Sequence, residues 1–403
     1  MKDFVLYKNK LFSFLIYITL LIDLFLGSIL IEDRTSSPLI GVIYKAILLI
    51  IVMSYITKLN KIAFFSFITL FALTLFNSIS DNIIYLPSNF ISGSKFILFN
   101  LIFFLFYFFY KKKYIDSKSI LKIISFSFII LIINQFLGFF GFGKSTYEHI
   151  NIGTTGFFFE SNSYALILII LEAIMLLFLA DRIKLWKLLS LIIVFNLLAL
   201  TISTKTAIIG SVIVPLILIY FKRKKIFYFM LMLLGLTIVS QIKYLENTTA
   251  VIKVVSEIDE DGFVEGLSSG RSDRSSLALN NYSEKFSFFE KLIGIGNNRV
   301  IRDTNLGGYS EIDFIDILLS TGIIGFLLVY FPFFIISYNL LLQNKKNKIV
   351  EFKIVFILNV FFLVISSLGG HLFTSGTPTI FLALLNIYPY TLIHNQSNKI
   401  LSN

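Results

Sequence analysis

The feature that most constrains this chain is the number and length of its apolar segments. Almost the whole sequence consists of apolar runs long enough to cross a lipid bilayer, and one polar stretch of about residues 241–309 interrupts them. A helix of about 20 residues, rising 1.5 Å per residue, covers a hydrocarbon core of about 30 Å. The sequence therefore predicts an all-α polytopic integral membrane protein with one long loop.

The composition excludes most other classes of protein. Of the 403 residues, 56% are hydrophobic and only 15% are charged, which is too little polar surface for a water-soluble fold. The net charge of +11 could indicate nucleic acid, but the basic residues lie at the ends of apolar runs. There they are typical of topology signals and of contacts with lipid headgroups, so we expect no nucleic-acid partner.

We predict about twelve transmembrane helices in a single polytopic domain, residues 1–403, with the loop 241–309 inserted between the ninth and tenth spans. The run 96–110 is short for a span, and the runs 185–201 and 206–221 almost continue into each other. The predicted spans are 11–31, 39–57, 62–80, 96–110, 119–141, 163–180, 185–201, 206–221, 226–240, 313–338, 352–368 and 377–394.

Basic residues alternate between the short loops and so indicate the orientation of the chain. One set of loops is rich in lysine and arginine, as at residues 111–113 and 222–225. The opposite short loops contain only Arg34, Lys95, Lys144 and Lys205. The positive-inside rule then predicts that both termini are cytoplasmic and that the loop 241–309 is extracytoplasmic.

The end of the polar loop has an amphipathic pattern. In and just after Ser283–Leu292, the apolar residues Phe286, Phe289 and Ile293 recur at helical spacing among charged residues. This pattern predicts a short helix that lies on the membrane surface. Gly294-Ile-Gly296 then indicates a turn.

Two arginines in the same loop are candidates for binding phosphate. Arg271 and Arg274 are three residues apart, so both guanidinium groups share one face if the segment is helical. Two permanently charged, forked donors make a good clamp for a pyrophosphate. The alternative is an ordinary solvent-exposed pair that forms a salt bridge with Asp273.

Three acids, Glu311, Asp313 and Asp316, open the span after the loop. Acids in a first helical turn are favoured by the helix dipole, and this purely structural explanation stays open. Carboxylates at the membrane edge are costly without a partner or a task. Glu311 and Asp313 are therefore candidates for a general base, or for orienting the two arginines.

Other polar residues are weaker candidates. Lys205 lies in a polar island between two apolar runs, where it can contact an anionic headgroup or simply extend to the interface. His371 is the histidine best placed for proton transfer, although a lone loop histidine is more often incidental. Asp23 and Glu172, inside spans, are functional candidates by default. No ligand spacing indicates a metal site.

Three segments have a distinctive order along the chain. Gly156–Ala165 has a glycine, aromatic residues and then Asn162 at the start of a span; Thr201–Ala207 contains Lys205; and Ser269-Gly-Arg271 precedes Leu292–Gly296. Together they resemble motifs of the bacterial O-antigen polymerase/O-antigen ligase superfamily, whose members are polytopic glycosyltransferases. The resemblance covers about residues 150–330 and the overall topology.

One departure from that family separates its branches. The ligases have His-Asn, then nine residues, then Gly-x-x-Gly; counting back from Gly322 and Gly325, this chain has Glu311-Ile312 instead. Because the ligase histidine is missing, the resemblance favours a Wzy-type polymerase. The alternatives are a ligase that transfers finished glycan to an acceptor, and a flippase or transporter of lipid-linked oligosaccharide.

The resemblance implies an enzyme of the bacterial inner membrane that joins undecaprenyl-pyrophosphate-linked repeat units into O-antigen, capsule or exopolysaccharide on the outer face. It implies no cofactor and no metal. The expected partners are lipid-linked glycans and membrane lipids, with a chain-length regulator as a further candidate. The expected catalytic residues are Arg271, Glu311 and Asp313, and the expected substrate-binding residues are Arg274, Lys205, Asn162 and His371.

Overall fold

The structure is a computed structural model that describes residues 2–32, 39–55, 61–147, 152–228, 271–303 and 310–400. Most of the predicted ninth span, 226–240, and the first part of the polar loop, residues 241–270, lie outside the described residues. The same is true of Ser269, which is part of one motif quoted above.

The other eleven predicted spans correspond to long helices. Nine helical segments of the described chain are long and apolar enough to cross a membrane by length and composition, and Ile43–Tyr55 is a shorter apolar helix. The all-α polytopic fold is therefore confirmed. The helices are α1 (Lys2–Glu32), α2 (Leu39–Tyr55), α3 (Lys61–Asp81), α4 (Leu86–Lys111), α5 (Ser117–Phe139), α6 (Ser161–Leu179), α7 (Leu185–Ile202), α8 (Lys205–Lys222), α15 (Asp313–Asn347), α16 (Val350–Gly369) and α17 (Gly376–Ile400).

The fourth helix differs from its predicted bounds. Instead of the short run 96–110, α4 begins at Leu86 after a 3-10 turn, η2 (Ile83–Tyr85), with a proline at its start. A proline is accepted there because its missing N–H would have no helical partner. Lys95, which we had assigned to a loop, consequently lies inside α4.

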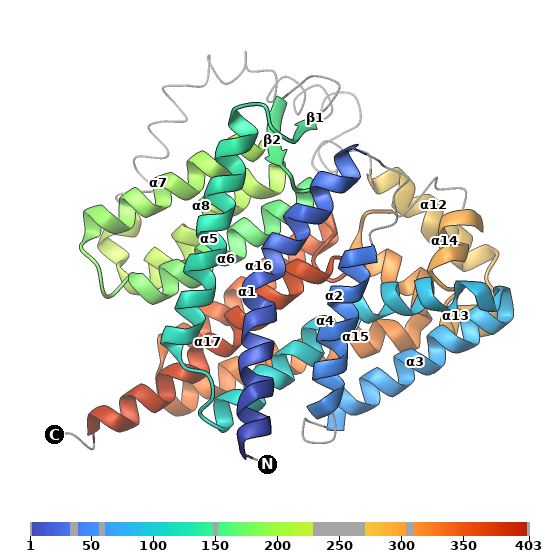
Figure 1. Ribbon diagram of the computed structural model, residues 1–403, viewed down its shortest axis with the longest axis horizontal. Helices are drawn as coiled ribbons and strands as arrows, with labels where there is room; N and C mark the ends of the chain where they lie inside the picture. The colour runs from blue at the N-terminus through green and yellow to red at the C-terminus, as the bar shows by residue number, and fades with distance from the viewer. Residues whose placement is uncertain are drawn as a thin grey trace.

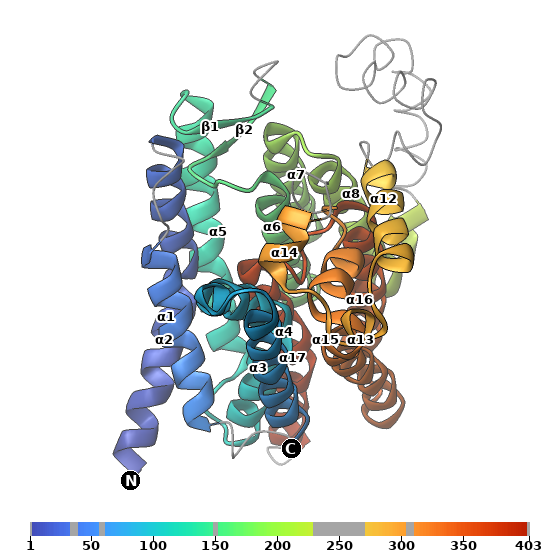
Figure 2. The same ribbon diagram turned by 90° about the vertical axis from the view of Figure 1, so that its right-hand side faces the viewer.

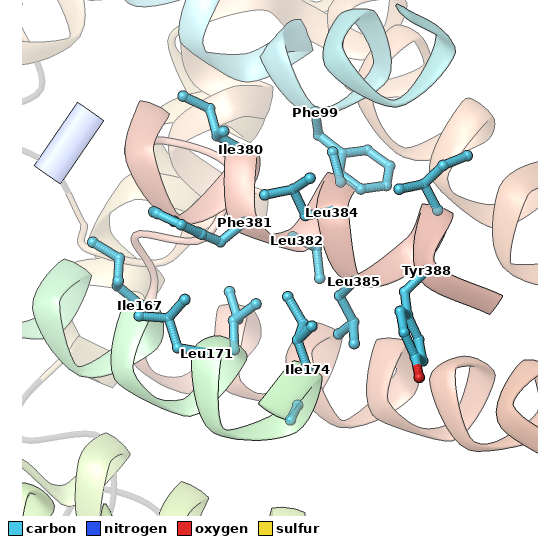
Figure 3. Close-up of a cluster of buried hydrophobic side chains, with 14 of the residues drawn as sticks. Phe99, Ile167, Leu171, Ile174, Ile380, Phe381, Leu382, Leu384, Leu385 and Tyr388 are labelled. Atoms are coloured by element: carbon cyan, nitrogen blue, oxygen red, sulfur yellow. The ribbon is translucent and has the colours of Figure 1, made fainter. Parts of the chain in front are cut away.

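The centre of the bundle is formed by α17, which packs on α4 and on α6. Figure 3 shows side chains of all three helices meeting, among them Phe99, Leu171 and Leu384, which are fully buried. Helices that are apolar all round are suited to a position surrounded by other helices. By contrast, outer helices such as α7 leave large apolar side chains exposed, as at Trp186 and Leu197, which suits contact with lipid.

The two ends of the bundle differ in what they carry. Both termini lie at one end in Figures 1 and 2, and a two-stranded antiparallel ribbon and α12 (Arg271–Glu284) lie toward the other end, on opposite sides in Figure 2. The ribbon pairs β1 (Lys144–Tyr147) with β2 (Ile152–Gly156) and was not predicted. This arrangement agrees with the alternation of the loops, while the side that faces the cytoplasm stays a prediction.

The described part of the polar loop contains three short helices, α12, α13 (Phe288–Ile293) and α14 (Asn297–Asp303). The single amphipathic helix predicted for Ser283–Leu292 is wrong, because the chain breaks between α12 and α13. Ser287 caps α13 through a reciprocal capping box with Glu290. Phe286 packs against a small buried cluster, whereas Phe289 is 70% exposed, so they do not share a face.

The predicted turn at Gly294-Ile-Gly296 is confirmed, and it fits against a kink in α15. Gly294 and Gly296 have positive φ angles, as does Gly322, where α15 leaves helical geometry. The Ile295 and Gly296 N–H groups donate to carbonyl groups of α15 just before the kink. A Cβ at Gly322 would overlap Leu292, so this close contact requires glycine.

Candidate functional site

A cavity of about 570 Å³ lies where α6, α8, α12, α15 and α16 meet at the ribbon end of the bundle. It brings together five residues that the sequence singled out from separate segments. Its lining includes Asn162, Lys205, Arg271, Glu311 and His371.

The two arginines of α12 are bound to one carboxylate. Arg271 donates from Nε and Nη2 to Oε2 of Glu311 at 3.0 and 2.8 Å, which is a forked contact. Arg274 lies 3.5 Å from Oε1 of the same group, but its side chain is 52% exposed and does not line the cavity. Glu311 therefore orients both guanidinium groups, which is one of the two roles considered from the sequence.

Lys205 owes its position to a two-residue turn between α7 and α8. Ser203 adopts a left-handed conformation that ends α7, and the Thr204 hydroxyl accepts from the Ala207 N–H to begin α8. Lys205 is the first residue of α8, and Asn162 lies in the first turn of α6. Both side chains thus border the cavity at helix N-termini, which favour anionic ligands.

Asp313 lies beneath the cavity rather than in its lining. It is 0% exposed, and its two oxygens accept from five donors. The donors are the N–H groups of His371 (2.7 Å), Leu372 (2.8 Å) and Phe373 (2.9 Å) and the hydroxyls of Thr374 (2.6 Å) and Ser366 (2.6 Å). A carboxylate saturated in this way is not available to accept a proton, so we assign Asp313 to holding the loop that carries His371.

The backbone around the site is held in sparsely populated conformations. Glu311 and His371 both have positive φ angles, 63° and 68°. A Cβ at Gly370 would overlap the Glu311 carbonyl oxygen, so the two segments lie in close contact. Such conformations cost about 1–3 kcal/mol each and persist where the surroundings enforce them. At His371, the hydrogen bond from its N–H to Asp313 contributes to that enforcement.

The sequence analysis did not select Glu160, which also lines the cavity. Its segment is held by α5: Asn134 donates to the Thr155 carbonyl and accepts from the Phe157 N–H, both at 2.9 Å. Phe158 stacks on Tyr164 with ring centroids 4.4 Å apart. The Asn134 amide thus holds the strand and loop that present Glu160, and it also donates to the Tyr164 hydroxyl on α6 at 3.2 Å.

Protein surrounds the Glu160 side chain, but part of its surface is exposed because it lines a cavity wall. Burial raises the pKa of this carboxyl, but His371, the Ser163 hydroxyl and two lysines together hold that pKa below its ordinary value. The Ser163 hydroxyl donates to Glu160 at 2.6 Å. Glu160 is thus ionised at neutral pH, and its position just before α6 was the available sequence signal.

The cavity has a polar end and an apolar end. The charged residues lie at the starts of α6, α8, α12 and α15, and the other wall is built from apolar residues of α8 and α16. Several of these, including Ile209, Val364 and Leu368, are large apolar side chains with exposed surface. A ligand with an anionic head and a long apolar tail matches this division. The apolar wall is formed by Ile209, Ile213, Phe361, Val364, Ile365 and Leu368.

Comparison with known proteins gives one family match. Residues 266–395 match the family model described as O-antigen ligase like membrane protein, which covers less than half of the chain. Neither the curated proteins nor the solved structures contain a match to this chain. The match includes α12 and the helices α15 and α16, and so most of one side of the cavity. It supports a membrane enzyme that acts on glycans.

Proposed function

We propose that this protein is a membrane glycosyltransferase that polymerises oligosaccharide repeat units linked to undecaprenyl pyrophosphate. The reaction would take place on the outer face of the bacterial inner membrane. The observation that supports this most strongly is the cavity, in which Arg271 and Lys205 face an apolar wall of α8 and α16. A polyprenyl diphosphate has the same division, because its charged head is joined to an isoprenoid chain.

The proposed glycosyl transfer requires that the departing diphosphate be stabilised. When the bond between the sugar anomeric carbon and the phosphate oxygen breaks, negative charge accumulates on the leaving group. Arg271 and Lys205 would stabilise this charge without reorganisation, because Glu311 and the start of α8 already hold them in position. Asn162 and His371 would contact the sugar or the phosphates, and Arg274 would act from the rim.

The choice between polymerase and ligase depends on Glu311. In the superfamily that this chain resembles, ligases have a histidine at the position of Glu311. In this protein the Glu311 carboxylate binds two arginines. A polymerase is the function that we favour on this ground. A ligase is the second candidate, because the matching family model is described by that activity.

The experiment that tests the proposal compares cell-envelope glycans from cells that lack the protein with those from cells expressing variants. Arg271→Ala is expected to abolish long chains and leave single capped repeat units, because the leaving group loses its forked donor. Arg271→Lys is expected to restore only part of the ladder, since an ammonium cannot make the two-pronged contact. Arg302→Ala, whose arginine pairs with Asp81 away from the cavity, is the control and should give a normal ladder.

The same gels separate the two candidate activities. Loss of the protein from a polymerase pathway leaves single repeat units, whereas loss of a ligase leaves full-length polymer on the lipid carrier. A normal ladder from Arg271→Ala would contradict any role of this cavity in glycan transfer.

A further inference from the structure

A second cavity, of about 190 Å³, adjoins the first and shares Phe159 and Glu160 with it. Its remaining walls come from α1, α2, α4, α6 and the residues around the start of α17. Three further charged residues line it, one from each of the first three of these helices: Asp23, Lys45 and Lys95.

The charges in this second cavity balance but are not paired directly. Asp23 accepts from the Thr377 hydroxyl, and Glu160 from the Ser163 hydroxyl. Within the described chain neither Lys45 nor Lys95 has a hydrogen bond or an ion pair, although both act electrostatically on Glu160. Charged groups within the depth of a membrane are costly unless they have a task. Ammonium donors beside carboxylates that have acceptor capacity left are suited to a polar, uncharged ligand.

We propose that the second cavity binds the sugar that carries the attacking hydroxyl, and that Glu160 takes the proton from that hydroxyl. This inference rests on the proposed function, because it assigns the acceptor half of the same reaction. The first cavity then holds the diphosphate of the donor, and the wall shared by Phe159 and Glu160 lies where the two substrates meet.

The size and lining of the second cavity fit one sugar ring. Its volume equals about six water molecules at about 30 Å³ each, which is room for a monosaccharide and not for a polyprenyl chain. Carboxylates and ammonium groups offer the acceptors and donors that sugar hydroxyls require. Phe159 presents an aromatic ring to the same space, and apolar faces of sugar rings pack on such rings.

Two of the other carboxylates near the reaction are already engaged, and a third, Asp23, lines the second cavity alone. Glu311 is bound to Arg271 and Arg274, and Asp313 is buried under five donors. Glu160 has one hydroxyl contact and faces both cavities. The pKa of Glu160 lies below its ordinary value despite burial, because His371, Ser163 and two lysines favour the ionised form.

The step balances without a further reactant. The acceptor oxygen forms a bond to the anomeric carbon of the donor while its proton passes to a Glu160 oxygen. The bond from that carbon to the phosphate oxygen breaks, and its electron pair leaves with the polyprenyl diphosphate. The proton on Glu160 is then released to water or to the departing diphosphate.

The first test is Glu160→Gln in purified full-length protein in lipid nanodiscs, with lipid-linked repeat units extracted from cells that lack the protein. We expect kcat to fall about 100- to 10,000-fold, the range lost with a general base. Binding of undecaprenyl diphosphate is expected to stay within about three-fold of wild type. Glu290→Gln is the matched control, because Glu290 on α13 pairs with Arg299 on α14 and lines neither cavity. Turnover of Glu160→Gln above about a third of the wild-type rate would overturn the inference.

The second test is Lys95→Met, which keeps the length of the side chain and removes its charge. We expect the KM for the acceptor repeat unit, at fixed donor concentration, to rise about ten-fold while kcat changes less. A normal acceptor KM with weakened binding of undecaprenyl diphosphate would instead make this cavity a diphosphate site and overturn the inference.

The two proposals fail in different ways. A wild-type protein that transfers no glycan would overturn the proposed function and this inference with it. An active wild type beside an active Glu160→Gln would overturn this inference alone.

Discussion

Among single residues, the acids at the ribbon end have taken on different tasks. Glu311 holds two guanidinium groups, Asp313 holds a backbone loop, and Glu160 faces cavity space. All three are carboxylates next to a membrane, and sequence type alone does not distinguish them. What distinguishes them is the number of donors that reach each carboxylate, because a saturated carboxylate has no lone pair left for a substrate.

Asp313→Ala is expected to destabilise the protein by about 2–4 kcal/mol, since it leaves buried donors of the His371 loop without an acceptor. The midpoint of thermal unfolding in detergent measures this. Asp273→Ala, at an exposed position on α12, is the control and should leave the midpoint unchanged. An unchanged midpoint for Asp313→Ala together with lost turnover would show that the carboxylate acts in the chemistry instead.

Among the secondary-structure elements, helix ends and one helix kink position the residues of the candidate site. The starts of α6, α8, α12 and α15 converge on the first cavity, and each supplies one or more of its polar residues or a residue just before it. The kink of α15 at Gly322 lets the turn at Gly294 lie against exposed carbonyl groups of the helix. That contact ties the end of the polar loop to the helix that follows Glu311.

Gly322→Ala is expected to destabilise the protein more than Gly141→Ala. Both glycines have positive φ angles, and this strain alone costs alanine about 1–2 kcal/mol. A Cβ at Gly322 would also overlap the backbone of Leu292 and Gly294, whereas one at Gly141 would meet nothing within 4 Å. Thermal unfolding of the two variants measures the difference, and equal midpoints would contradict the importance of the contact.

For the whole molecule, the two ends of the bundle differ in structure. The ribbon and α12 lie toward one end, and the termini lie at the other. Arg271, at the start of α12, lines the first cavity. Glycan transfer outside the cell requires the cavity end to face outward, as the distribution of lysine and arginine predicts.

The orientation can be tested directly, because the chain has no cysteine of its own. We expect Ser276→Cys, exposed on α12, to react with a membrane-impermeant maleimide in intact spheroplasts. Lys112→Cys, exposed in the turn after α4, should react only after the membrane is permeabilised. The reverse pattern of labelling would place the cavity in the cytoplasm and remove the basis of the proposed function.

The sequence was sufficient for the properties that depend on local composition. The lengths of the apolar runs predict the helices, and their flanking charges predict an orientation, because both follow from the transfer of single segments into lipid. The chemistry of Arg271, Lys205, Asn162 and His371 also marked them as candidates, although their distances along the chain say nothing of their separation in space.

Only the tertiary structure decided how these residues combine. It brought Arg271 to Glu311, buried Asp313 under five donors, and opened Glu160 to two adjoining cavities. It also set Asp23 and Lys95 in one cavity, although they come from different helices. The physical reason is that the number of donors around a carboxylate, and the space beside it, depend on helix packing between distant segments, which no local pattern records.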